Sequence, residues 1–174
     1  VGEPGGRTPG IACRTIPDAA SRPIVSLPVF ENDPEWHLRD AAVVVHAEAG
    51  DRALPGFRGL YIAWLEAFAD ERRRFAGDPT RRLVVVCESR QIGEALVGWN
   101  DSRVRLVHTV HNSHLPEPYN DPGAPVTGLW ERWLRTLDVY DAVLWPTAAQ
   151  RDEVAARFGD PGTFHVAPNT IGIG

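Results

Sequence analysis

The amino-acid sequence predicts an α/β protein built around a mostly parallel sheet with helices on both faces. Three observations support this fold class. Residues 83–87 (Leu-Val-Val-Val-Cys) form a continuous apolar run, as expected of a strand buried on both faces. Residues 57–75 carry apolar side chains at helical spacing. From residue 41 onward, strand-like and helix-like segments alternate, which is typical of parallel sheets with crossover helices.

The first 40 residues are predicted to form a separate, partly irregular segment. Residues 1–23 are rich in Gly, Pro, Arg and Thr, which favour turns. Residues 24–30 are expected to form a short strand, and Pro28 places this strand at a sheet edge. We therefore predict an N-terminal segment over 1–40 and one α/β domain over 41–174.

The elements of the predicted domain follow one another with short connections. The helix over 57–75 has arginines in its last turns, where cations complement the helix dipole, and Gly77-Asp78-Pro79 ends it. The pattern Thr147-Ala-Ala-Gln150 is a capping box that begins the last helix. In chain order the predicted elements are a strand at 41–46, the helix at 57–75, a strand at 83–87, a helix at 90–99, a strand at 104–110, a helix at 128–137, a strand at 142–145, a helix at 147–158 and a strand at 163–167.

Composition and charge argue against several classes of function. The formal net charge of −5 argues against nucleic-acid binding, and no apolar run is long enough to cross a membrane. The two cysteines do not make a disulfide framework, so a reducing cytosol is the expected compartment. Arg supplies every basic residue, which suggests a GC-rich bacterial genome. Because the chain contains no Met, we expect a fragment of a longer protein.

Polar and titratable residues gather where the predicted strands end. In open α/β sheets, the carboxyl ends of the strands line the binding crevice. Imidazole exchanges a proton near neutral pH, so His111 is the leading catalytic candidate, although a strand-end histidine bonded to a carbonyl would give the same pattern. The substrate-binding candidates at the same edge are Arg90, Asn112, His114, Thr147 and Asn169.

His108, His111 and His114 recur at every third residue, and this spacing admits a metal triad as an alternative. Side chains alternate along a strand, so His108 and His111 are predicted to point to opposite faces. No Cys or carboxylate stands close by in the sequence to complete a ligand shell. We therefore expect no metal, and we interpret His108 as structural.

Two further groups of residues allow both a structural and a functional interpretation. The basic cluster of Arg72–Arg74, Arg81 and Arg82 could contact a polyanionic acceptor or an anionic lipid, but a solvated helix end is the preferred interpretation. The tryptophans fit core positions better than sugar-stacking platforms; these are Trp64, Trp130, Trp133 and Trp145.

Several segments together resemble the N-terminal domain of glycosyltransferase family 4. The resemblance covers about residues 57–172, and within the family it is greatest to bacterial poly(glycerol-phosphate) α-glucosyltransferase-like enzymes. The matching features are a strand ending in His over 107–114, the segment from Asp141 to Val154 with its Thr147-x-x-Gln150, a helix ending in Phe158-Gly159 and a strand ending in Pro168-Asn169.

The resemblance implies the N-terminal half of a GT-B enzyme, in which two Rossmann-like domains face each other across a cleft. Such enzymes transfer a sugar from a nucleotide-sugar donor such as UDP-glucose to an acceptor hydroxyl, with retention of configuration and no metal or other cofactor. The N-terminal domain mainly holds the acceptor, and His111 would lie near the reacting centre. No second Rossmann-like unit follows, so we expect the donor-binding domain to be missing and the chain alone to be inactive.

Two rival functions stay open at this point. One is a noncatalytic α/β module that binds a sugar or a phosphate, and the other is a metal-dependent hydrolase that uses the histidines. The acceptor is equally open among a glycan, a teichoic-type polymer, a protein and a small metabolite. The expected location is cytoplasmic, with peripheral contact at the inner membrane face as a further option.

Overall fold

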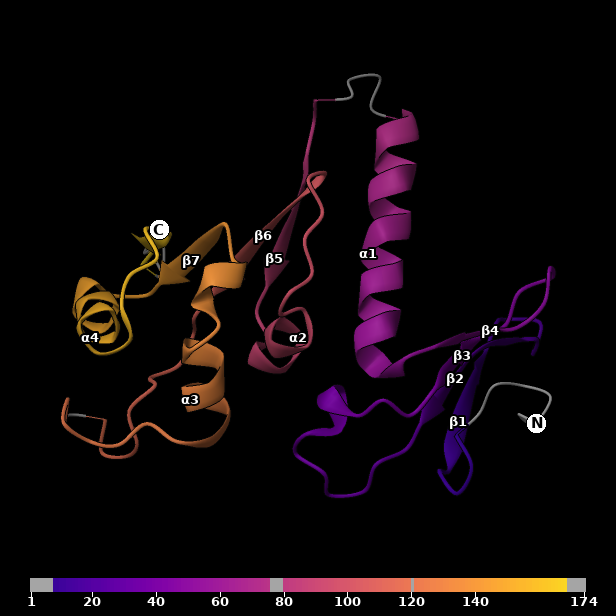
Figure 1. The fold of residues 1–174 in the computed structure, drawn as a ribbon, viewed down its shortest axis with the longest axis horizontal. Helices are drawn as coiled ribbons and strands as arrows, with labels where there is room; N and C mark the ends of the chain where they lie inside the picture. The colour runs from indigo at the N-terminus through magenta and orange to yellow at the C-terminus, as the bar shows by residue number, and fades with distance from the viewer. Residues whose placement is uncertain (1–7, 76–79, 120, 169–174) are drawn as a thin grey trace, which may run out of the picture. The chain divides into compact units, whose positions relative to one another are not determined.

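The computed structural model describes residues 8–75, 80–119 and 121–168 (Figure 1). The chain divides into two compact units, Val1–Phe68 and Ala69–Gly174. Each unit has its own four-stranded sheet, with strand orders β1-β2-β3-β4 and β5-β6-β7-β8. Among the residues just named, no helix is long and apolar enough to span a bilayer.

The sheet of the first unit is antiparallel throughout. Its two central valines, Val43 and Val44, are both almost fully buried, which explains the continuous apolar run in the sequence. This run was predicted to begin the parallel sheet, and that prediction is wrong, because it pairs antiparallel with its neighbours on both sides. The strands are β1 (Cys13–Pro17), β2 (Pro23–Pro28), β3 (Val43–Val45) and β4 (Arg52–Leu54), and a short 3-10 helix, η1 (Trp36–Leu38), lies between β2 and β3.

The predicted irregular segment before residue 24 instead contains a β-hairpin. Asp18 organises its turn, because one carboxylate oxygen accepts hydrogen bonds from the backbone N–H groups of Ala20 and Arg22. Prolines mark the ends of the two strands, where a missing N–H donor is tolerated. Pro28 was predicted to place its strand at a sheet edge, and that prediction is wrong, because β2 lies between β1 and β3 and Pro28 stands at its end.

A chain of polar side chains crosses the first sheet. The Ser26 hydroxyl lies 2.8 Å from the Thr15 hydroxyl and 2.9 Å from His46 Nε2, and His46 Nδ1 lies 2.9 Å from Asp51 Oδ1. The order Ser-His-Asp is that of a hydrolase triad. Ser26, however, is fully buried, so a substrate cannot reach its hydroxyl, and the chain of bonds serves to hold the strands together.

The sheet of the second unit is parallel throughout, which confirms the predicted fold class for this part of the chain. Helix α2 packs against β5, and α4 packs against β7 and β8, so helices flank the sheet. The strands are β5 (Leu83–Cys87), β6 (Val104–Thr109), β7 (Ala142–Trp145) and β8 (Phe164–Val166). The helices are α2 (Arg90–Ala95), α3 (Gly128–Leu134), the 3-10 helix η2 (Leu137–Val139) and α4 (Ala148–Phe158).

Helix α1 (Gly56–Phe75) forms where helical spacing predicted it, but its buried side differs from the predicted one. Leu65 and Ala69, one turn apart, are the deeply buried side chains. Trp64 was assigned to the core and is instead 58% exposed, with its ring stacked on Phe68. The aromatic residues Trp64 and Phe68 lie on one side of the helix, and the buried side chains Leu65 and Ala69 each follow one residue later.

Aromatic rings fill the interior of the second unit, and Trp133 and Trp145 are fully buried, as predicted. The Trp133 indole N–H donates a 3.0 Å hydrogen bond to the Tyr140 hydroxyl. That hydroxyl lies against the backbone of Gly93 in α2, where an added Cβ would come within 1.7 Å of it. Only glycine therefore allows α2 to approach this aromatic core.

We expect Ser26→Ala to reduce the free energy of unfolding by about 1–3 kcal/mol, because the buried hydroxyl's hydrogen bonds to Thr15 and His46 are lost. Urea unfolding measures the change. Ser102→Ala is the matched control, since this serine is exposed and its substitution should change stability by less than about 0.5 kcal/mol. Equal effects of the two substitutions would contradict the structural role of Ser26.

We expect Gly93→Ala to destabilise the second unit by at least about 1–3 kcal/mol, because overpacking outweighs the roughly 1 kcal/mol that alanine gains in helix propensity. Adding Tyr140→Phe removes the clashing oxygen and should restore part of the loss. Gly123→Ala, which meets only a flexible carboxylate at 3.2 Å, is the control. A Gly93→Ala protein as stable as wild type in thermal unfolding would contradict the close approach.

Candidate functional site

A cavity of about 290 Å³ lies at the carboxyl ends of β5 and β6. Glu88 and Arg90 enter it from the segment after β5, and His111 and Asn112 enter it from the segment after β6. Trp130 of α3 forms part of its wall. The structure thus brings three of the predicted site residues, Arg90, His111 and Asn112, to one place, as parallel strand ends require.

His111 lies at the open side of this cavity. Its side chain is 42% exposed, and its Nε2 atom lies 3.3 Å from the Glu88 carboxylate. A carboxylate at this distance can accept a hydrogen bond from the ring and so fix its orientation. His111 is therefore able to exchange a proton, or a hydrogen bond, with a molecule that enters from solvent.

His108 lines the same cavity, which corrects the prediction that it and His111 point to opposite faces. Strand β6 ends at Thr109, so side-chain alternation stops before His111 is reached. His108 is 1% exposed, and its ring centroid lies 4.4 Å from that of Trp133. Among residues 8–75, 80–119 and 121–168, its Nδ1 atom has no hydrogen-bond partner.

The electrostatic surroundings of His108 keep its ring neutral. Burial is the main cause, and the positive charge of Arg90 and the interaction with His111 add to it, lowering the pKa of His108 from 6.5 to about 3. The cavity is therefore bordered by a buried, neutral imidazole at His108 and by an exposed one at His111.

Arg90 occupies the first position of α2, directly after the capping residue Ser89. Its guanidinium group lies 3.7 Å from the centre of the Trp130 ring, in a cation–π contact. Burial lowers the pKa of Arg90, although the group stays charged. The tryptophan was assigned to the core, yet it is only half-buried, and it holds this cation in the wall of the cavity.

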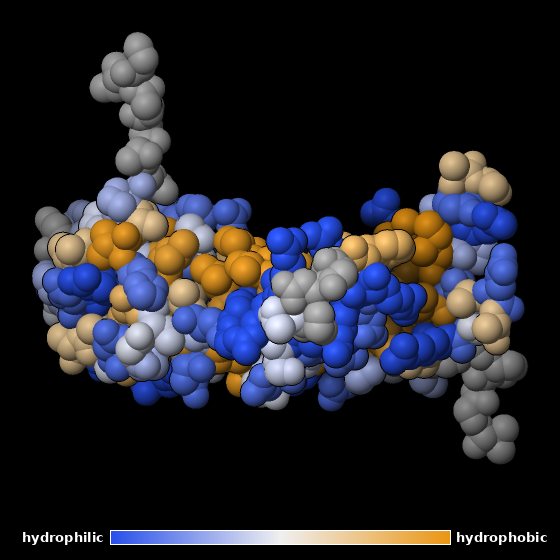
Figure 2. All heavy atoms as spheres, turned by 90° about the horizontal axis from the view of Figure 1, so that it is seen from above, coloured by the Kyte–Doolittle hydropathy of each residue, from blue (hydrophilic) through white to orange (hydrophobic). Residues whose placement is uncertain are grey.

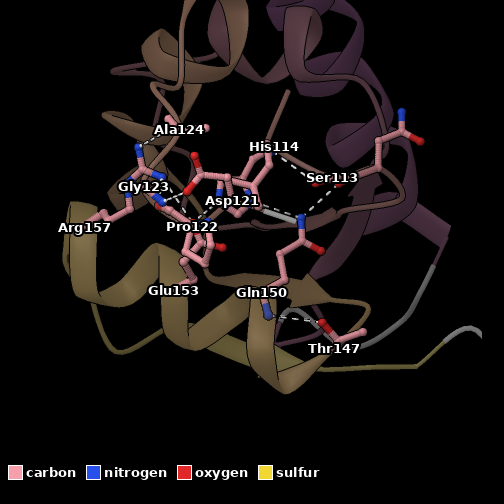
Figure 3. Close-up of polar contacts among 12 residues, drawn as sticks. Ser113, His114, Asp121, Pro122, Gly123, Ala124, Thr147, Gln150, Glu153 and Arg157 are labelled. Atoms are coloured by element: carbon pink, nitrogen blue, oxygen red, sulfur yellow. Dashed lines mark hydrogen bonds and ion pairs between the residues drawn. The ribbon is translucent and has the colours of Figure 1, made fainter. Parts of the chain in front are cut away.

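His114 lies in the interior and is not one of the side chains that line the cavity. Its Nε2 atom lies 3.0 Å from the Glu153 carboxylate, and its Nδ1 atom lies 3.4 Å from the Gln150 side-chain nitrogen (Figure 3). Gln150 also donates to the backbone carbonyl of Asn112 at 3.0 Å. His114 therefore fastens the loop after β6 to α4, and its predicted substrate-binding role has no support in this geometry.

The predicted capping box at the start of α4 is half right. The Thr147 hydroxyl accepts a hydrogen bond from the Gln150 backbone N–H at 3.1 Å, as expected. The Gln150 side chain does not complete the box, because it reaches the loop after β6 instead. Thr147 is exposed and caps the helix outside the cavity. Asn169, the remaining predicted residue, lies outside the described residues.

A second contact fastens the same loop further along its length. Arg157 donates to the backbone carbonyls of Pro122 and Ala124 at 2.9 and 3.0 Å, and it also donates to Glu153 at 3.1 Å. Figure 3 shows Gln150, Glu153 and Arg157 extending from α4 toward this loop. One face of α4 thus satisfies backbone carbonyls that a proline-rich loop cannot satisfy by itself.

The described part of the chain contains no group of three or more His, Cys, Asp or Glu side chains that could hold a metal ion. His108, His111 and His114 do not converge, because His114 turns toward Glu153. These residues give the rival metal-dependent hydrolase no metal centre.

Sequence reasoning missed the importance of Glu88. This residue was not among the predicted site residues. The signal was present, because Glu88 directly follows β5 and the parallel pairing places Cys87 opposite His108. That register brings the next residues of both strands to one edge.

Residues 29–173 match the family model described as Glycosyltransferase Family 4. The chain belongs to this family. No curated protein matches the sequence. Two crystal structures resemble the fold at 13% identity: TarM, with a TM-score of 0.64, and an S. aureus TarM mutant in complex with fondaparinux, α-GlcNAc-glycerol and UDP, with a TM-score of 0.63. Each match covers 92% of this chain and 29% of the TarM chain.

The family assignment confirms the resemblance found in the sequence, and the similarity to the TarM structures confirms the predicted fold of this chain. Because the chain spans less than a third of the TarM length, the comparison with TarM reaches only part of that protein.

We expect the stability of the protein to fall between pH 6.5 and about 3 in part through His108. Its folded pKa is lower than its unfolded one, so the unfolded state binds more protons in this window, at up to about 1.4 kcal/mol per pH unit. His108→Phe removes this contribution, so its stability relative to wild type should improve as the pH falls.

Urea unfolding at a series of pH values measures this difference. His165→Phe on β8 is the control, because this histidine is exposed rather than buried. A constant difference between wild type and His108→Phe would show that the ring is not held neutral.

Proposed function

We propose that this chain is the acceptor-side half of a retaining glycosyltransferase, which transfers a sugar from a nucleotide-sugar donor to an acceptor hydroxyl. Family membership and the TarM-like fold support this function. The observation that carries it is the position of His111, exposed at the mouth of a cavity and within 3.3 Å of the Glu88 carboxylate.

The groups around the cavity suit a polyhydroxylated ligand. His111 can hydrogen-bond a sugar or acceptor hydroxyl near the reacting centre, and Glu88 fixes the orientation of its ring. Asn112 adds an amide that both donates and accepts. Arg90, held by Trp130, adds a positive charge. In the proposal, these residues position the hydroxyl that attacks the anomeric carbon.

The size of the cavity agrees with a half-site. Ligand clefts usually measure about 300–1,000 Å³, and this cavity of about 290 Å³ lies at the lower limit. In the proposal, a donor-binding domain supplies the opposite wall and stabilises the diphosphate leaving group. UDP, which is bound in the TarM complex, is a model for that leaving group. The proposal requires no metal and no cofactor other than the donor substrate.

The partners and the location belong to the same proposal. The acceptor is a glycan, a teichoic-type polymer, a protein or a small metabolite, and α-GlcNAc-glycerol in the TarM complex is an example of a glycosylated glycerol. We propose a bacterial cytoplasmic enzyme, with peripheral contact at the inner membrane face.

In the full-length protein, we expect His111→Ala to lower kcat by about 10²–10⁴-fold, because a positioned proton-transfer group is lost. Sugar transfer to acceptor measures the effect, and circular dichroism checks the fold. His165→Ala, on an exposed strand position, should keep normal turnover. Glu88→Gln should have a smaller effect than His111→Ala, because it disturbs only the orientation of the ring.

Near-normal turnover of the His111→Ala enzyme would remove this residue from the mechanism. The 174-residue chain alone should bind acceptor without transferring sugar. Binding without transfer by the full-length protein would instead support the rival noncatalytic module.

A further inference from the structure

A second cavity, of about 720 Å³, lies at the opposite edge of the parallel sheet from the candidate site. Its lining comes from the loop that leads into β6, from the starts of β6 and β7, and from Thr163 just before β8. We call it the amino-edge cavity. Among the described residues, none lines both this cavity and the candidate site. In the left part of Figure 2, which shows the second unit, hydrophobic and hydrophilic side chains lie side by side.

Apolar side chains supply part of the lining, and Trp99 is the largest of them. It lines the cavity together with Val97 and Val139, which come from two different segments of the chain. Within the described ranges the Trp99 indole N–H donates to no residue, whereas the corresponding group of Trp133 is bonded to the Tyr140 hydroxyl. An indole is a flat apolar surface with one hydrogen-bond donor at its edge. Trp99 therefore offers a ligand both a stacking surface and an unused donor.

The carboxylates of the amino-edge cavity differ in their partners. Asp141 accepts from Arg105 at 2.6 Å and from a backbone N–H of β6 at 2.9 Å. Asp101 forms an ion pair with Arg103. Asp138 is exposed, and within residues 8–75, 80–119 and 121–168 its side chain makes no hydrogen bond or ion pair. Asp138 is therefore the carboxylate of this cavity that can accept hydrogen bonds from a ligand.

Two neutral polar groups complete the lining. Asn100 is exposed, and its amide can both donate and accept. The Thr163 hydroxyl oxygen borders the cavity but is buried, and it has no hydrogen-bond partner among the residues that the structure describes. A buried hydroxyl without a partner is unfavourable, so a ligand hydroxyl on this side of the cavity would supply a missing bond.

The charges of the lining exclude one class of ligand. Three carboxylates and a single guanidinium group, that of Arg105, line the amino-edge cavity. Anions such as phosphate esters are repelled by this excess of negative charge. A neutral pyranose fits the groups present, because its C–H face can pack on an indole while its hydroxyls bond to a carboxylate and an amide. A volume of about 720 Å³ lies within the usual range of about 300–1,000 Å³ for ligand clefts.

We propose that the amino-edge cavity binds a neutral sugar, with the pyranose ring stacked on Trp99 and its hydroxyls bonded to Asp138 and Asn100. Strand β6 is six residues long, so roughly 20 Å of strand separates this cavity from the site at His111. A sugar bound here is therefore held away from the candidate catalytic group, and the site is noncatalytic. The proposal concerns binding alone and does not rest on the proposed glycosyltransferase activity.

NMR titration of the ¹⁵N-labelled 174-residue chain with neutral methyl α-glycosides tests the proposal. The probes are the glycosides of glucose, galactose, mannose and N-acetylglucosamine. We expect at least one of them to shift the Trp99 indole N–H resonance, assigned with Trp99→Phe, to saturation. The indole resonances of the fully buried Trp133 and Trp145 should stay in place. Glucose 6-phosphate at low ionic strength should bind about tenfold more weakly than the glucoside, because the cavity repels its charge.

Variants identify the groups that bind the sugar, and the backbone amide of Gly98, in the same lining, reports their affinity. Trp99→Ala should abolish saturable binding. Asp138→Asn should weaken it by about threefold to tenfold, and because Asp138 is exposed the fold should be kept. Trp64→Ala is the matched control, since it removes a 58% exposed tryptophan of the other unit and should leave the affinity unchanged. Circular dichroism of every variant checks the fold.

Four results would overturn the proposal. They are no shift of the Trp99 indole with any of the four glycosides, full affinity in Asp138→Asn, an equal loss in Trp64→Ala, and shifts confined to the Trp130 indole, which would place the sugar at the candidate site instead. Tighter binding of tetramethylammonium ion than of every glycoside would likewise assign the cavity to a cation. His111→Ala should keep glycoside binding at Trp99. The titration measures no sugar transfer, so this proposal and the proposed function succeed or fail separately.

Discussion

The parallel pairing of β5 with β6 determines where the polar groups of the second unit lie. The register runs from Leu83 opposite Val104 to Cys87 opposite His108. Two strands that point the same way must place their carboxyl ends together, and so the groups that follow them meet at one edge. The same pairing collects the residues that precede the strands at the other edge. The candidate catalytic site at the carboxyl ends of the two strands is a consequence of this constraint.

The loop after β6 depends on this sheet and on α4 in equal measure. A segment with several prolines has few backbone donors of its own, so its carbonyl groups need partners from elsewhere. Gln150 and Arg157 supply these partners from α4, and the buried His114 connects the loop to Glu153 on the same helix. The position of Asn112, and with it one side of the cavity, therefore depends on residues of α4 that do not line the cavity.

The strands and helices of the second unit could be predicted from the sequence because the patterns that indicate them are local. A continuous apolar run identifies β5, and a Thr before a helical segment identifies the cap of α4. The prediction that β5 is buried on both faces is wrong, because Val84 and Val86 are 59% and 55% exposed. The first unit was missed because its strands are short and bounded by prolines, and because antiparallel pairing leaves no mark on a run as apolar as Val43–Val45. At Gln150 and Trp64 the helix was predicted correctly, but the position of the side chain was not. The Gln150 side chain bonds to the loop after β6, and Trp64 is exposed.

The places of His108 and His111 at the cavity depend on where β6 ends, which the spacing of the histidines in the sequence does not reveal. Strict alternation would separate His108 from His111, yet β6 ends between them and both reach the same cavity. His108 lies among aromatic rings and beside Arg90, where a second positive charge would be both desolvated and repelled. His111 lies three residues further along, exposed to solvent, with its Nε2 atom 3.3 Å from the Glu88 carboxylate. Of the two rings, His111 is therefore the one that a molecule from solvent can reach, while His108 offers a buried ring that stays neutral.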